Sequence, residues 1–284
     1  QDEDITRINQ DVKEKRQELI SAYKGTFLAE FLQATRQIDV PDAPRDEAGN
    51  VTDSLFQYRY YKSHYWDNFD VSNPRLLRTT LYENKLMNYV KNVVMQHPDT
   101  LIKETERIVE ASMHDDELFR YVLGTLYNHY NKSKVMGMDK VFANLAQYYI
   151  SGKADWNDST FVADLKERVA KMQHTFIGDT AKNFLAPTAK DRHIRLHEID
   201  APYTVIYFYD PECGHCKEET PVMKEVSDKY MEEGVKFIGF YTQVEQKKWK
   251  DYIDKNELHQ WINVWDPYNR TNFRFNYHIY STPT

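Results

Sequence analysis

The chain has 284 residues, of which 29% are charged, and a formal net charge of −7. Lysine and glutamate are interspersed along its whole length, so the sequence lacks the basic patch with which proteins bind nucleic acids. No apolar stretch approaches the roughly 18 residues that a membrane-spanning helix needs. The sequence therefore predicts a solvated, mildly acidic surface, no nucleic-acid partner and no transmembrane segment. Its length is sufficient for two domains.

The first residues, Gln1-Asp2-Glu3-Asp4, lack both the basic start and the apolar core of a signal peptide. A mature or truncated secreted protein would look the same, so these residues leave the compartment open.

Residues 1–175 show apolar side chains at helical spacing and predict an all-α first domain. Acidic side chains at Asp115-Asp116-Glu117 favour the positive end of a helix dipole and mark one helix start. Residues 39–55, with two prolines and Gly49, predict a loop. Three segments place the following residues on one helix face: Leu101, Thr105, Ile108 and Ser112, with Ile102 and Val109 beside them; Leu118, Val122, Leu126 and Tyr130; and Phe161, Val162, Leu165, Val169 and Met172.

An unusual aromatic stretch, residues 58–69, lies within this helical half. Tyrosine, tryptophan and arginine are enriched at interfaces, so one hypothesis makes the stretch a peptide-recognition surface. The hypothesis we favour is that the rings pack helices together or against the second domain. The histidines of this half show no metal-ligand spacing, and no phosphate-binding loop or Ser-His-Asp order is present. We therefore predict neither a metal nor another cofactor.

The two cysteines lie together in Cys213-Gly214-His215-Cys216, directly after the apolar run 203–209. That run predicts a buried strand, and the apolar residues from Cys216 to Tyr230 predict a helix. A helix N-terminus stabilises a thiolate, which is the attacking species in disulfide exchange. We therefore predict that Cys213 is the nucleophile and Cys216 the resolving thiol. Positive charge on His215 would further favour the thiolate.

The cysteine pair has three other interpretations. A structural zinc site needs about four ligands, and no second pair of ligands exists in the sequence. Covalent haem attachment requires a histidine directly after the second cysteine, where this chain has Lys217. An inert structural disulfide stays open, although a redox-active couple is favoured.

Several motifs surround this pair. Residues 177–184 resemble the lead-in G-x-x-A-P-x-F, with Lys182 in place of the proline. Pro221 falls eight residues after Cys213, and Thr282-Pro283-Thr284 follows near the end of the chain. From Phe176 onward the chain therefore resembles the TlpA/ResA-like thiol–disulfide oxidoreductases, which have a thioredoxin fold.

This resemblance implies a fold and a set of site residues. The fold is an N-terminal all-α domain, residues 1–175, followed by a thioredoxin-like α/β domain, residues 176–284. Cys213 would attack, Cys216 would resolve the mixed disulfide, and the loop at Thr282-Pro283 would have a cis peptide bond and receive a substrate strand beside Gly214. The implied partners are cysteine-containing protein substrates and a thiol/disulfide redox partner.

The chain departs from the thioredoxin pattern in two places. Thioredoxins keep a buried acid six residues before the first cysteine, where this chain has Tyr207. Glu198, Asp200 and Asp210 are near in sequence, but none is assigned as proton acceptor. A thioredoxin fold also continues past the cis-proline with strands and a helix, so we expect a C-terminally incomplete domain and a longer natural protein.

The two-domain arrangement resembles thioredoxin-like proteins of Bacteroidetes in which a helical domain precedes a TlpA-like domain. Residues 65–70, 96–99 and 148–156 carry this looser likeness. The TlpA-like group works mostly outside the inner membrane, often with a tether such as a lipid anchor on the precursor. Two cysteines and no third suit an oxidising compartment. A periplasmic location is therefore expected, with the cytoplasm as the alternative.

Two other functions compete with a thiol–disulfide oxidoreductase. One is a peroxiredoxin-like peroxidase, since the lead-in at Gly178 occurs there too. Such enzymes need a threonine or serine three residues before the reactive cysteine, where this chain has Asp210. The other is a binding or scaffold protein in which the helical domain does the essential work.

Overall fold

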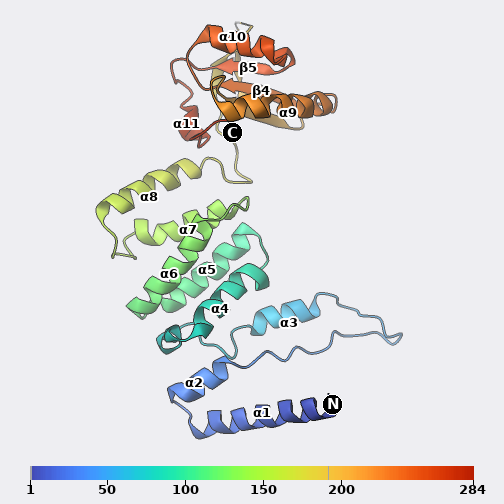
Figure 1. The fold of residues 1–284 in the computed structure, drawn as a ribbon, viewed down its shortest axis with the longest axis vertical. Helices are drawn as coiled ribbons and strands as arrows, with labels where there is room; N and C mark the ends of the chain where they lie inside the picture. The colour runs from blue at the N-terminus through green and yellow to red at the C-terminus, as the bar shows by residue number, and fades with distance from the viewer. Residues whose placement is uncertain (1, 191) are drawn as a thin grey trace. The chain divides into compact units, whose positions relative to one another are not determined.

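A computed structural model describes residues 2–190 and 192–284 of the chain (Figure 1). The chain divides into two compact units, Gln1–Val162 and Ala163–Thr284. The described part of the first unit is helical, and the second combines helices with strands. None of the described helices has the length and apolar character that crossing a bilayer requires.

Helices follow one another through the first unit, and the last of them continues into the second. Two short helical turns, Pro74–Arg78 and Tyr89–Val93, flank the fourth helix. The α-helices are α1 Asp2–Ala22, α2 Phe27–Ala34, α3 Phe56–His64, α4 Thr80–Asn88, α5 Pro98–Ser112, α6 Asp116–Asn131, α7 Met138–Ile150 and α8 Ser159–Met172.

The core of the first unit is formed by the apolar faces of α5, α6 and α7. Every residue of the predicted stripes on α5 and α6 is buried, from Leu101 on α5 to Tyr130 on α6. The acidic start of α6 acts as predicted, because Asp115 Oδ1 accepts a hydrogen bond from the backbone N–H of Leu118 at 2.9 Å. On α8, Leu165, Val169 and Met172 are also buried, but these three residues belong to the second unit.

The aromatic stretch contributes to packing within the first unit. Tyr65 and Phe69 are both 1% exposed. The ring of Tyr65 lies 4.9 Å from that of Tyr89, and the ring of Phe69 lies 5.6 Å from that of Tyr82. These rings therefore join α3 and the loop after it to α4 and the turn that follows.

The second unit has a three-stranded parallel sheet in the order β3-β4-β5, with a separate antiparallel pair. The register places Tyr207 of β3 beside Gly239 of β4, and Gly239 beside Asn263 of β5. A Cβ on Gly239 would lie 2.8 Å from Asn263 Oδ1, so a larger residue there would have to displace the Asn263 side chain. The elements are β1 Leu185–Pro187, β2 His193–Arg195, β3 Thr204–Tyr209, α9 Gly214–Met231, β4 Lys236–Tyr241, α10 Gln246–Lys255, β5 Ile262–Trp265 and α11 Phe273–Asn276.

Both faces of the sheet are covered, which explains why β3 reads as a continuous apolar run. Successive side chains of a strand point to opposite faces. Tyr207 and Tyr209 accordingly join a cluster with Cys216, Trp249 and Tyr252. The intervening residue, Phe208, joins the other cluster with Phe240 and Val264. The first turn of α9, which carries Cys216, therefore lies against an aromatic core.

Helix α9 buries a face that its hydropathy did not indicate. Of the apolar residues that marked the helix in the sequence, Val222, Val226 and Tyr230 are 54%, 40% and 39% exposed, whereas Met223 is half-buried against the aromatic cluster. Its buried residues are Cys216, Thr220 and Ser227. Hydrogen-bonding side chains therefore line the buried face of this helix.

Candidate redox site

The cysteine pair lies where β3 gives way to α9. The turn Asp210–Glu212 follows the strand, and Cys213 is the N-cap residue of the helix. The backbone N–H of Cys213 donates to the carbonyl of Asp210 at 3.1 Å. The carboxyl ends of all three parallel strands meet at this edge of the sheet, which is where open α/β sheets place their sites.

Cys213 is half-buried and its sulfur is surrounded by donors. The backbone N–H of Cys216 lowers the pKa of the Cys213 thiol, and the Thr282 side chain and the backbone N–H of His215 act in the same direction. The amides of His215 and Cys216 are among the unpaired N–H groups of the helix N-terminus. In its thiol form, Cys213 Sγ donates to the Thr282 carbonyl at 3.1 Å.

Cys216 has the opposite environment. Its side chain is fully buried, and that burial raises the pKa of the thiol. The backbone N–H of Asp210 donates to Cys216 Sγ at 3.5 Å. Both cysteines are free thiols in this structure. The helix amides thus lower the pKa of the Cys213 thiol, whereas burial raises the pKa of the Cys216 thiol.

The segment Thr282-Pro283, just before the last residue of the sequence, lies beside Cys213. The peptide bond between Thr282 and Pro283 is cis. Thr284 exchanges two backbone hydrogen bonds with Phe208, at 2.9 and 3.1 Å, in the pattern of an antiparallel ladder. This pairing with β3 places the Thr282 carbonyl at the Cys213 sulfur.

The remaining predicted residues contribute through the backbone. Gly214 is the first residue of α9 and is exposed. The side chain of His215 is also exposed, and its backbone N–H acts on Cys213. Tyr207, which replaces the buried acid of thioredoxins, is 4% exposed and hydrogen-bonds to Thr220 at 3.0 Å.

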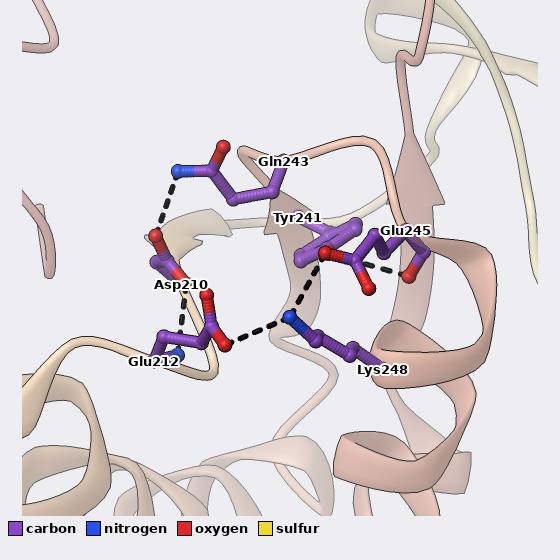
Figure 2. A network of polar contacts seen from close by, with 6 residues as sticks. All are labelled: Asp210, Glu212, Tyr241, Gln243, Glu245 and Lys248. Carbon is purple, nitrogen blue, oxygen red and sulfur yellow. Dashed lines mark hydrogen bonds and ion pairs between the residues drawn. The ribbon is translucent and has the colours of Figure 1, made fainter.

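A polar network connects the loop before Cys213 with the segment after β4 (Figure 2). Asp210 accepts from Gln243 Nε2 at 2.7 Å and from the Glu212 backbone N–H at 2.8 Å. Lys248 on α10 bridges Glu212 and Glu245 at 2.8 Å each. The Asp210 carboxylate is thus held toward Gln243, while its backbone N–H meets Cys216. Glu198 pairs with Arg195, elsewhere in this unit.

No metal centre is formed by the residues that the structure describes: they contain no group of three or more histidine, cysteine or acidic side chains placed to hold an ion. A cavity of about 730 Å³ lies beside β1 and the segment after β5, with Trp265 and Tyr268 in its wall. Neither Cys213 nor Cys216 lines it. The cysteine pair therefore does not open into this cavity.

Comparison with protein families divides the chain in a similar way. Residues 8–175 match the domain of unknown function DUF5106, and residues 177–279 match the AhpC/TSA family. The first match alone covers more than half of the chain.

Individual relatives extend this result. The thiol-disulfide oxidoreductase ResA of Bacillus cereus is 28% identical over 88 residues, which are 31% of this chain and 49% of that protein. This chain thus aligns with about half the length of the curated relative.

A solved thioredoxin-like protein from Bacteroides caccae has a TM-score of 0.58 at 17% identity, over 88% of this chain and 89% of its own, and so shares the fold. A thiol:disulfide interchange protein from a Bacteroides species is 20% identical, with a TM-score of 0.36, over 39% of this chain and 72% of its own.

Proposed function

Because the chain belongs to the DUF5106 family and its second domain is a thioredoxin-like AhpC/TSA domain, we propose that it exchanges the Cys213–Cys216 disulfide with protein substrates. The observation that carries this proposal is the asymmetry of the pair. Cys213 is accessible with a lowered pKa, and Cys216 is buried with a raised one. A nucleophile and a resolving thiol need this difference.

The reaction starts from the dithiol. The Cys213 thiolate attacks one sulfur of a substrate disulfide, a Cys213–substrate disulfide forms, and the other substrate sulfur leaves as a thiolate. Cys216 then loses its proton and attacks Cys213. The Cys213–Cys216 bond forms, the substrate bond breaks, and the second substrate sulfur leaves. The substrate gains two electrons that the dithiol loses, and the reverse sequence oxidises a dithiol substrate.

The net direction depends on the reduction potential of the couple. A Gly-His pair between the cysteines is shared with protein disulfide isomerase, whose potential is about −180 mV, against about −270 mV for thioredoxin. TlpA-like proteins are generally reductants, so the two resemblances predict opposite directions of electron transfer. Equilibration with glutathione buffers decides between them: a potential below that of thioredoxin excludes an oxidase role.

We place the reaction outside the cytoplasm, in the periplasm, with a thiol/disulfide redox partner that resets the pair. The presence of two cysteines and no third in 284 residues supports an oxidising compartment. Expression of a tagged full-length protein, followed by cell fractionation, tests this placement. Recovery in the cytoplasm alone contradicts it.

Trapping tests the reaction itself. Cys216→Ser leaves the attacking thiol and removes the resolving one, so this variant accumulates mixed disulfides with its substrates. Cys213→Ser is the matched control and captures none. If Cys216→Ser also captures no disulfide-linked partner, the exchange proposal fails. If both variants retain full cellular function, the essential work belongs to the helical domain, as a binding or scaffold protein would require.

A peroxidase reaction is disfavoured by the residue three positions before Cys213. Peroxiredoxins need a threonine or serine hydroxyl there, and this chain has Asp210, whose carboxylate is held by Gln243. Turnover of hydrogen peroxide by the wild-type protein would reverse this conclusion.

A further inference from the structure

Three buried hydroxyl groups form a continuous chain beneath the resolving cysteine. Tyr207 on β3 lies 3.0 Å from Thr220 on α9, measured between their oxygens. Thr220 lies 2.7 Å from the hydroxyl of Tyr252 on α10. Tyr252 donates to the backbone carbonyl of Cys216 at 3.0 Å. The chain thus joins three elements of the second unit and ends on the peptide group of Cys216.

The direction of every hydrogen bond in this chain follows from its last acceptor. A carbonyl oxygen accepts only, so the single proton of Tyr252 points at Cys216. Thr220 must then donate to Tyr252, and Tyr207 must donate to Thr220. Each proton is donated to the next group along the chain, and the last is donated to the Cys216 carbonyl, so none is left to donate to the Cys216 sulfur.

The surroundings keep these hydroxyls in place and protonated. Tyr207, Thr220 and Tyr252 are 4%, 0% and 7% exposed. Burial raises the pKa of Tyr207 to about 12 and also raises that of Tyr252 above its ordinary value. At neutral pH the chain therefore neither accepts a proton from Cys216 nor loses one of its own.

The carbonyl at the end of the chain belongs to a weakened part of α9. Pro221 lies inside the helix and has no N–H, so the carbonyl four residues earlier, that of Lys217, lacks its helical donor. Cys216 directly precedes Lys217. A hydrogen bond from α10 to the Cys216 carbonyl therefore fixes the first turn at the place where the helix itself provides less support.

We propose that Tyr207, Thr220 and Tyr252 are positioning residues for the resolving step: their hydroxyl chain holds the Cys216 peptide, and the last donated proton brings partial positive charge to its carbonyl. This inference rests on the proposed disulfide exchange. Tyr207 occupies the position of the buried acid of thioredoxins, but the hydroxyl chain acts on Cys216 by orientation and charge. It does not take the Cys216 proton. The proton of Cys216 leaves to solvent or to the departing substrate thiolate.

The charged and titratable groups facing Cys216 come from several elements. Cys213 lies on its own helix, Asp210 lies in the preceding loop, and Tyr207 and Tyr252 lie on β3 and α10. The Asp210 carboxylate is held by Gln243 and the Glu212 N–H, so its backbone N–H is the part that meets the sulfur. Substitutions in the hydroxyl chain leave these contacts of Asp210 in place.

The test separates the two steps with oxidised glutathione as the probe. The reduced full chain is mixed with the probe, quenched with acid and analysed by mass spectrometry, which resolves the Cys213–glutathione adduct from the protein disulfide. We expect Tyr252→Phe to form the adduct at the wild-type rate and to resolve it about five- to tenfold more slowly, the loss of one net hydrogen bond. The dithiol–disulfide equilibrium with glutathione should shift toward the disulfide.

Thr220 provides the matched pair of variants. Thr220→Val keeps the shape and breaks the chain, whereas Thr220→Ser keeps the hydroxyl. We expect slow resolution in the first variant and near wild-type resolution in the second. Tyr241→Phe is the control, because it removes a tyrosine hydroxyl of the neighbouring strand that bonds to Glu245 and not to this chain.

Each result has a distinct meaning. If the wild-type protein forms no adduct, the proposed function fails. If it forms and resolves the adduct, and Tyr252→Phe and Thr220→Val resolve it at the wild-type rate with an unchanged glutathione equilibrium, the hydroxyl-chain inference is overturned. Should Tyr252→Phe fail to fold, the Thr220→Val and Thr220→Ser pair decides: equal resolution in these two variants also overturns it.

Discussion

Helix α6 in the first unit and helix α9 in the second differ in what they bury. The inward face of α6 carries Leu118, Val122 and Leu126, all 0% exposed. The inward face of α9 carries Cys216, Thr220 and Ser227, also 0% exposed, while Val222 lies outside. In α6 burial follows the hydrophobic effect. In α9 the buried face is set by hydrogen bonds and by the chemistry of the thiols. Hydropathy therefore predicts the buried face of α6 correctly and that of α9 wrongly.

The largest expected effect is on the chemistry of α9. Cys213→Ser should abolish formation of the glutathione adduct, because a hydroxyl does not supply the thiolate that attacks a disulfide. Mass spectrometry after reaction with oxidised glutathione measures this directly. Leu126→Ala, in the helical unit, is the control and should form the adduct normally. Adduct formation in Cys213→Ser would assign the nucleophile to Cys216.

The next effect contrasts the apolar residues of the two helices. Leu126→Ala should lower the free energy of unfolding of its unit by about 2–5 kcal/mol, since it leaves a cavity in the core. Val222→Ala, on the exposed side of α9, should change stability by less than about 0.5 kcal/mol. Urea unfolding of both variants makes the comparison. Equal losses would mean that the exposed stripe of α9 is covered in solution.

A smaller effect is expected at the start of α6. Asp115→Ala removes the acceptor for the Leu118 N–H and should lower the free energy of unfolding by about 1 kcal/mol. Asp115→Asn retains a side-chain oxygen and serves as the control. A loss in Asp115→Asn equal to that in Asp115→Ala would show that charge, and not the cap, is responsible.

The smallest effect concerns the exposed network of Figure 2. Lys248→Met removes two ion pairs with Glu212 and Glu245, which are solvent-screened and contribute little to stability. Its Tm should match that of the wild type. The freed charge of Glu212, next to Cys213, should raise the pKa of Cys213 slightly at low salt, an effect that 0.5 M salt removes by screening. A large drop in Tm would identify the network as structural.

The sequence predicted those parts of the molecule in which one physical rule dominates. Helical periodicity identified the buried stripes of α5 and α6, and the acidic cap of α6 followed from the helix dipole. The Cys-x-x-Cys spacing after an apolar run placed Cys213 at a helix N-terminus, where the structure shows it as the N-cap. The order of a helical region followed by a thioredoxin-like domain also followed from the family resemblance.

Features that join distant segments escaped prediction. Nothing in the sequence relates Tyr207, Thr220 and Tyr252, because each lies on a different element and only the fold brings their hydroxyls together. The donor to Cys216 Sγ is a backbone N–H, that of Asp210, which side-chain identity does not reveal. The pattern predicted a helical half but no individual helix at α1 to α4 or at α7, although α2 has a standard cap at Thr26.

The difference between the pKa values of the two thiols decides which cysteine is the nucleophile. The pH dependence of iodoacetamide alkylation measures it, with Cys216→Ser reporting Cys213 and Cys213→Ser reporting Cys216. Helix amides favour the Cys213 thiolate, so its alkylation should reach half its maximal rate below the ordinary thiol pKa of about 8.5. Burial disfavours the Cys216 thiolate, so its midpoint should lie above that value. Equal midpoints, or the reverse order, would contradict the assignment of nucleophile and resolving thiol.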